Sequence, residues 1–80
     1  MSSTRERPQR MAGKLLAIRQ HLGVSQTGMK RLLNYPGPYT RISEWELGKR
    51  QPPMTIVLAY ARAAHVPMEQ IVDDQLELEF

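Results

Sequence analysis

Residues 41–53 read RISEWELGKRQPP. On a helix, Ile42 and Trp45 lie three positions apart and share one apolar edge, while the serine and the first glutamate of the stretch fall on the other side. Gly48 is suited to ending the helix, and two adjacent cations follow it. The stretch therefore predicts a short helix that packs along one edge, presents polar groups along the other, and ends in positive charge.

The segments on either side of this stretch also have helical patterns. Apolar residues recur at spacings of three and four in residues 11–22, and Ser25 is a favourable N-cap for a second helix. His65 falls where a left-handed residue is expected to end a later helix. The helices are expected over residues 9–22, 26–33, 38–47, 54–65 and 67–72. Together they predict an all-α, compact bundle of about five short helices.

The composition limits the classes of protein that this chain can belong to. With 80 residues and no cysteine, we expect one domain without disulfides or a thiolate metal site. Residues 1–50 hold ten Lys or Arg against three Glu, whereas residues 51–80 hold one against five acidic residues. A basic half of this kind either meets a nucleic acid or is a solvated face without a partner. No run of residues reads as a secretion signal or a membrane span, so we expect a soluble, cytoplasmic protein.

The segments between and beyond the helices have their own signatures. NYPGPY, residues 34–39, contains two prolines and a glycine and must form a turn. Residues 1–8 are expected to form a flexible basic arm. Arg5, Arg7 and Arg10 either reach along the DNA backbone or into the minor groove, or contact nothing. Residues 74–80 form an acidic tail with alternating apolar residues, which either frays or pairs as an edge strand across a dimer. The domain itself is expected over residues 9–73.

Two short helices joined by a tight turn, within a basic half-chain, form the arrangement that presents a second helix to the DNA major groove. Further residues carry a recognisable motif: Arg19, Gln26, Glu46, Gly48, Lys49 and Pro52 or Pro53, with ISEW at 42–45 and LAYARAAHVPMEQIV at 58–72. In these features the span of residues 14–72 resembles the Cro and phage-repressor type of helix-turn-helix domain, the Xre family.

The resemblance implies a lambda-repressor-like fold with defined roles for individual residues. Arg19 and Glu46 are implied to form a buried or half-buried ion pair that holds the first helix to the third. Contacts to DNA phosphates are implied for Gln26, Lys49 and Arg50. Contacts to base edges are implied for Tyr39, Thr40, Arg41, Ser43 and Glu44. In chemical terms, a glutamate can accept from cytosine N4 and an arginine can donate two bonds to guanine.

The sequence offers no catalytic constellation. His21 and His65 lie in different turns without a nearby partner, no glycine-rich nucleotide motif is present, and the C-terminal carboxylates resemble a solvated acidic end. We therefore expect no enzymatic activity, no metal and no cofactor. Trp45 is expected in the core rather than as a base-stacking platform, while Tyr35 either packs on Pro36 or touches sugar-phosphate.

These observations predict a sequence-specific double-stranded DNA-binding transcriptional regulator, a repressor that binds a palindromic operator as a homodimer. The alternative is a protein-interaction module, such as an antitoxin, whose fifth helix and acidic tail bind a protein partner. A non-specific nucleic-acid binder is a third hypothesis. A tail that is required for a protein partner but not for DNA would favour the interaction module. Substitutions on the third helix that change affinity without changing sequence preference would favour the non-specific binder.

Overall fold

The computed structural model describes residues 8–80, and within them it contains five helices and no strand. The expected all-α bundle is thus confirmed. The expected arm over residues 1–8, including Arg5 and Arg7, lies outside the described residues except for Pro8. The helices are α1 Met11–Leu22, α2 Gln26–Leu33, α3 Thr40–Glu46, α4 Met54–Ala64 and α5 Glu69–Val72.

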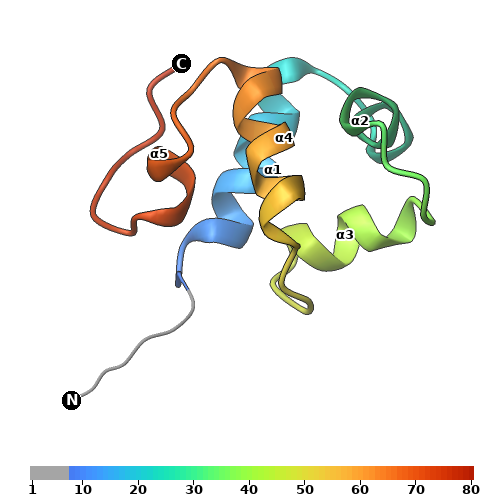
Figure 1. The fold of residues 1–80 in the computed structure, drawn as a ribbon, viewed down its shortest axis with the longest axis horizontal. Helices are drawn as coiled ribbons and strands as arrows, with labels where there is room; N and C mark the ends of the chain where they lie inside the picture. Colours follow the sequence, from blue (N-terminus) through green and yellow to red (C-terminus); the bar gives the residue numbers. More distant parts are fainter. Residues whose placement is uncertain (1–7) are drawn as a thin grey trace.

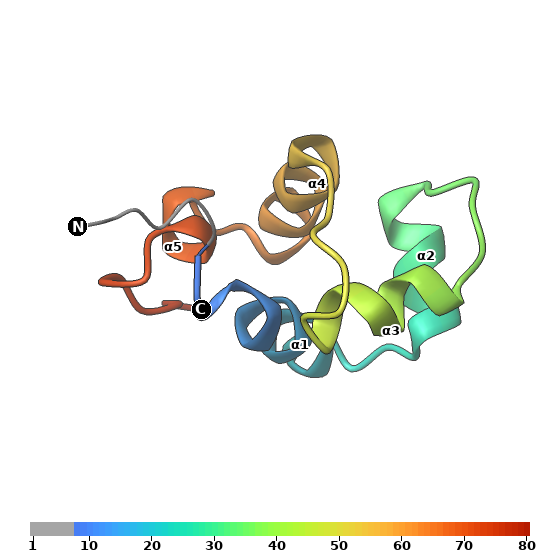
Figure 2. The same ribbon diagram turned by 90° about the horizontal axis from the view of Figure 1, so that it is seen from below.

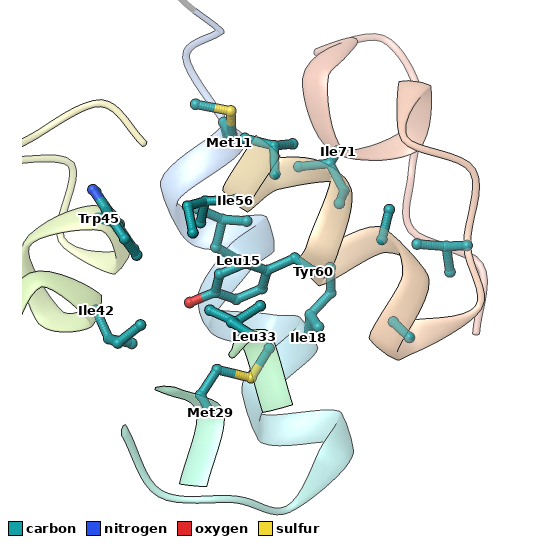
Figure 3. Packing of buried hydrophobic residues seen from close by; sticks show 14 residues of the cluster. Met11, Leu15, Ile18, Met29, Leu33, Ile42, Trp45, Ile56, Tyr60 and Ile71 are labelled. Atoms are coloured by element: carbon teal, nitrogen blue, oxygen red, sulfur yellow. The ribbon is translucent and has the colours of Figure 1, made fainter. Parts of the chain in front are cut away.

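The helices surround one apolar core. α1 and α4 form the centre of the molecule, with α2 and α3 on one side and α5 on the other (Figure 1 and Figure 2). Leu15 and Ile18 of α1 are fully buried, and they meet Tyr60 of α4 in the middle of the cluster (Figure 3). The buried apolar residues are Met11, Leu15, Ile18, Met29, Leu33, Ile42, Trp45, Ile56, Val57, Tyr60, Ala61, Ala64, Val66 and Ile71.

Local chemistry explains where several helices begin and end. The Ser25 hydroxyl accepts a hydrogen bond from the Gly28 amide at 3.0 Å and caps the start of α2. α1 ends at Gly23, and α4 ends at His65, both in the left-handed conformation. His65 has φ 58°, as the sequence predicts, and its amide donates back into the last turn of α4.

The third helix is shorter than expected. The sequence predicts residues 38–47, whereas α3 spans Thr40–Glu46. Arg41 and Ile42 donate their amides to carbonyls only three residues earlier, at Pro38 and Tyr39, so the chain enters α3 through a tight turn. Tyr39 consequently lies just before the helix and is 51% exposed.

The C-terminal segment, residues 73–80, is packed against the domain, so the expectation that it frays is wrong. It forms no strand among residues 8–80, and pairing as an edge strand across a dimer stays a prediction. It folds back against the start of α1. The Asp74 carboxylate accepts the backbone amides of Gln9 at 2.7 Å and Arg10 at 3.0 Å. The Arg10 guanidinium donates in return to Glu77 at 2.6 Å, and the Phe80 ring stacks on a histidine of α1 at 3.9 Å between ring centroids. Acidic residues are held there because they satisfy amides and a cation of the basic half.

A buried lysine strengthens the same contact. Lys14 lies on the inner side of α1, with only 4% of its surface exposed. Its ammonium donates to the carbonyl oxygens of Asp73 and Leu76, both at 2.8 Å. Burial, with a smaller contribution from the charge of Arg10, lowers the pKa of the Lys14 ammonium. The carbonyls of the C-terminal segment thus take the place of water around this charge.

Candidate nucleic-acid interface

The α2–α3 turn is organised by an aromatic contact. Tyr35 is half-buried and packs edge-on against Trp45, with 5.1 Å between ring centroids and 64° between ring planes. The Tyr35 ring covers Gly37, where a Cβ atom would collide with the tyrosine hydroxyl. Tyr35 therefore packs against Trp45, and a side chain at position 37 would have to displace the Tyr35 ring.

Trp45 anchors α3 to the body of the protein. Its side chain is 2% exposed and belongs to the apolar core together with Ile42 (Figure 3). The expectation that Trp45 is a core residue is confirmed. The indole ring therefore offers no stacking face to a base, and the opposite edge of α3 is the one that can meet base edges.

A charged network fixes α3 against α1 and α4. Arg19 of α1 donates through Nε to both carboxylate oxygens of Glu46, at 2.9 and 3.0 Å, and through Nη1 to the Val24 carbonyl at 3.1 Å. The Glu46 side chain is only 3% exposed, so its charge depends on these donors. This is the pair that the family motif implies.

The network has a third member that the motif does not indicate. The Tyr60 hydroxyl of α4 donates to Glu46 Oε2 at 3.0 Å. Burial and the neighbouring carboxylate raise the pKa of the Tyr60 hydroxyl far above its ordinary value, so it remains a donor. Three helices thus meet at one carboxylate, which sets the angle of α3.

The outward side of α3 carries the residues expected to meet base edges. Thr40 is exposed, while Arg41, Ser43 and Glu44 are half-buried and remain accessible. With Tyr39 just before the helix, all five expected base-contacting residues lie outside the core. Their side chains combine hydroxyl groups, a guanidinium and a carboxylate, which are the groups that read base edges in a major groove.

Two arginines converge on Glu44. Its Oε1 atom lies 3.0 Å from Nε of Arg50 and 3.3 Å from Nε of Arg41. The Arg41–Glu44 pair could have been predicted, because the two residues lie three positions apart on one helix. The Arg50–Glu44 pair could not, because it depends on how the chain turns after α3. Glu44 is therefore a partner of two cations as well as a candidate for base contact.

The end of α3 presents positive charge. The amides of Lys49 and Arg50 donate to the Glu44 carbonyl at 2.9 and 3.3 Å, and Gly48 has φ 78°, so the chain reverses tightly. Lys49 and Arg50 are both exposed at this reversal, whereas Gln26 is half-buried at the first position of α2. The three residues expected to contact phosphates therefore lie at the two helix ends of the α2–α3 unit.

Within residues 8–80, no group of three His, Cys, Asp or Glu side chains is placed to hold a metal ion. No helix in this part of the chain is long and apolar enough to cross a membrane.

The fold of the chain is similar to that of a solved structure. The chain is similar to the P22 c2 repressor protein, whose crystal structure is in complex with synthetic operator 9T, with a TM-score of 0.69 and 20% identity. The similarity covers 80% of this chain and 94% of the repressor chain. The chain has the lambda-repressor-like helix-turn-helix fold. It matches no family model and no curated protein.

Within the helix-turn-helix fold, sequence analysis missed three contributions. Tyr60 completes the network at Glu46, Arg50 pairs with Glu44, and Lys14 secures the C-terminal segment. Lys14 falls three residues after Met11 and four before Ile18, so its position on the apolar stripe of α1 was a usable signal. No comparable signal marked the other two contacts, because both join residues on different structural elements.

Proposed function

We propose that this protein binds double-stranded DNA in a sequence-specific manner and regulates transcription. The observation that carries the proposal is the two-sided character of α3. One edge is buried through Ile42 and Trp45, and the opposite side leaves hydrogen-bonding groups accessible. A helix held this firmly and this asymmetrically is suited to enter a major groove. The fold shared with a repressor solved on its operator supports the same conclusion.

Direct reading of bases is assigned to the outward side of α3 and the residue before it. Arg41 can donate two bonds to guanine, and the Thr40 methyl or hydroxyl can meet thymine or another base edge. Glu44 already holds Arg41 and Arg50 through Oε1, so it orients both guanidinium groups. Its second oxygen can accept from cytosine N4. Tyr39 and Ser43 complete the proposed set.

Docking on the sugar-phosphate backbone is assigned to Gln26, Lys49 and Arg50. The two cations lie at the reversal after α3, where a phosphate strand bordering the groove passes the end of a recognition helix. Gln26 opens α2, so its side chain and the first amides of that helix face the same kind of ligand. These contacts fix orientation without selecting a base.

We further propose that the protein acts as a homodimer on a palindrome and represses by occluding a promoter in the cytoplasm. One small module makes too few base contacts for useful specificity, whereas two copies about 34 Å apart combine theirs. If each protomer neutralises about three or four phosphates, log K should fall with log salt with a slope of about −5 to −7. A slope near half that value at saturating protein would indicate a monomer on each site.

Selection of binding sites from random duplex DNA tests the proposal. The wild-type protein should enrich a palindromic motif, and Glu44→Ala should relax it at one position in each half-site. Arg62→Ala is the matched control, because Arg62 is an exposed cation on α4, outside the proposed interface. A folded protein that enriches no motif contradicts sequence-specific binding.

The alternative of an antitoxin-like module depends on α5 and the C-terminal segment binding a protein. Asp74 and Glu77 of that segment are already paired with the start of α1. A partner that bound these carboxylates would have to displace contacts within the chain. This observation favours the DNA-binding proposal over the alternative.

A further inference from the structure

One buried donor in the described part of the chain has no partner. Among residues 8–80, the indole Nε1 of Trp45 is the buried side-chain nitrogen or oxygen without a hydrogen bond. A buried donor without an acceptor is unfavourable, and native proteins keep few of them. The buried Tyr60 hydroxyl, by contrast, has an acceptor on Glu46. The unsatisfied indole therefore suggests a partner that the described residues do not supply.

The indole lies beside a cleft. Figure 3 shows the Trp45 nitrogen on the side of the ring that is turned away from Leu15 and Ile56. The cleft has a volume of about 250 Å³ and lies between the start of α1 and the segment after α3, with Trp45, Gly48 and Arg50 in its lining. A single water occupies about 30 Å³ in the liquid, so the cleft has room for a larger group.

We propose that this cleft receives one backbone phosphate of bound DNA, with the Trp45 N–H and the Arg50 guanidinium as donors. The inference rests on the proposed DNA-binding function and adds a contact to it. Both groups are donors only, so the ligand must supply acceptors, and the cation selects an anion. Among residues 8–80, no carboxylate lines the cleft, although Glu44 lies 3.0 Å from Nε of Arg50.

The position of the cleft agrees with a phosphate ligand. Arg50 lies four residues after the end of the proposed recognition helix, where a DNA strand would pass. One bond to Glu44 engages Nε of Arg50, and a guanidinium has five N–H donors in all. The indole nitrogen is covered in the free chain, so the contact requires the non-helical segment 47–53 to shift as DNA binds.

The single tryptophan makes a direct test practical. The chain contains one Trp, so a ¹⁵N-labelled sample has one indole N–H signal by NMR. The probe is a random-sequence duplex of about 20 base pairs, long enough for two half-sites, at low salt. We expect this signal to move downfield in step with binding. Inorganic phosphate alone should move the indole signal in the same direction but by a smaller amount. The difference between the two shifts separates binding of a free anion from binding of the DNA backbone.

The outcomes separate this inference from the function on which it rests. If the duplex shifts backbone amide signals but not the indole signal, the phosphate contact is overturned and DNA binding stands. A duplex that does not bind at all overturns the proposed function.

A pair of substitutions provides an independent readout. Trp45→Phe keeps a ring and removes the donor, so affinity should fall about tenfold on every duplex, the loss expected for one hydrogen bond to a charged group. Its salt slope should not change, because a neutral donor displaces no counterion. Arg50→Ala should instead make the slope shallower by about 0.9 for each copy bound. Equal affinity of folded Trp45→Phe and wild-type protein contradicts the proposal, and circular dichroism checks the fold.

Discussion

α1 is contacted at its two ends by two different polar clusters, and the comparison shows how burial changes the value of a charge. Near its C-terminal end, Arg19 joins Glu46 and Tyr60 in a network whose carboxylate is almost fully covered. Near its N-terminal end, Arg10 meets Asp74 and Glu77 at the surface. The first cluster holds the proposed recognition helix, and the second holds the C-terminal segment.

Removing one member of the buried network should have the largest effect on stability. Glu46→Ala leaves the Arg19 guanidinium and the Tyr60 hydroxyl without their acceptor, which costs about 3–5 kcal/mol for a truly buried pair. Urea denaturation followed by circular dichroism measures the change in free energy of unfolding. Glu44→Ala is the matched control, because it removes a half-exposed carboxylate from the same helix. Equal losses in the two variants would contradict the distinction between buried and exposed charge.

An intermediate effect is expected at Lys14, which is buried but belongs to the second cluster. Lys14→Met keeps the apolar stem and leaves the Asp73 and Leu76 carbonyls without the ammonium, so we expect a loss of about 1–3 kcal/mol. The same denaturation experiment measures it. DNA affinity should be unchanged, because Lys14 is buried away from α3. If Lys14→Met is as stable as wild type, the apolar part of the side chain is sufficient to hold the C-terminal segment and the ammonium bonds add nothing.

The smallest effect should come from the exposed carboxylates. Amides of Gln9 and then Arg10 hold the pKa of Asp74 below its ordinary value, and the Arg10 side chain does the same for the pKa of Glu77. Because both folded pKa values are depressed, their stabilisation is present above the ordinary carboxyl range and is lost as pH falls through about 4 and below. In Asp74→Asn, folding stability should therefore fall slightly less steeply at acid pH than in wild-type protein.

Glu79→Gln is the control for that experiment, because its carboxylate belongs to the same segment and makes no ion pair among the described residues. Thermal melts between about pH 3 and 7 compare the two variants. If stability depends on acid pH in the same way in Asp74→Asn and wild-type protein, the Asp74 carboxylate does not stabilise the fold. Added salt should weaken the surface cluster more than the buried one.

The two regions also differ in how far the sequence predicted them. Helix periodicity, the Ser25 cap and the left-handed His65 are local properties, so their positions could be predicted from neighbouring residues. The Arg19–Glu46 pair followed from a motif with fixed spacing. The path of the C-terminal segment could not be predicted, because Asp74 meets amides more than sixty residues earlier in the chain.

The candidate site shows the same limit on a smaller scale. Burial of Ile42 and Trp45 followed from their spacing, which also fixed the outward side of α3. The tight entry into that helix and the packing of Tyr35 over Gly37 depend on how six turn residues fold together. Tyr39 lies just before α3, whereas a helix that begins at Pro38 would include it.

We propose that α3 reads base edges. The most direct measurement is a fluorescence-anisotropy comparison of the selected duplex with a scrambled duplex of the same length and composition, at near-physiological salt. The account predicts that wild-type protein prefers the selected duplex by at least about 10³-fold. Glu44→Ala should lose about 1–3 kcal/mol of that preference, and Glu79→Ala should lose none. Equal binding of both duplexes by folded wild-type protein would contradict the account.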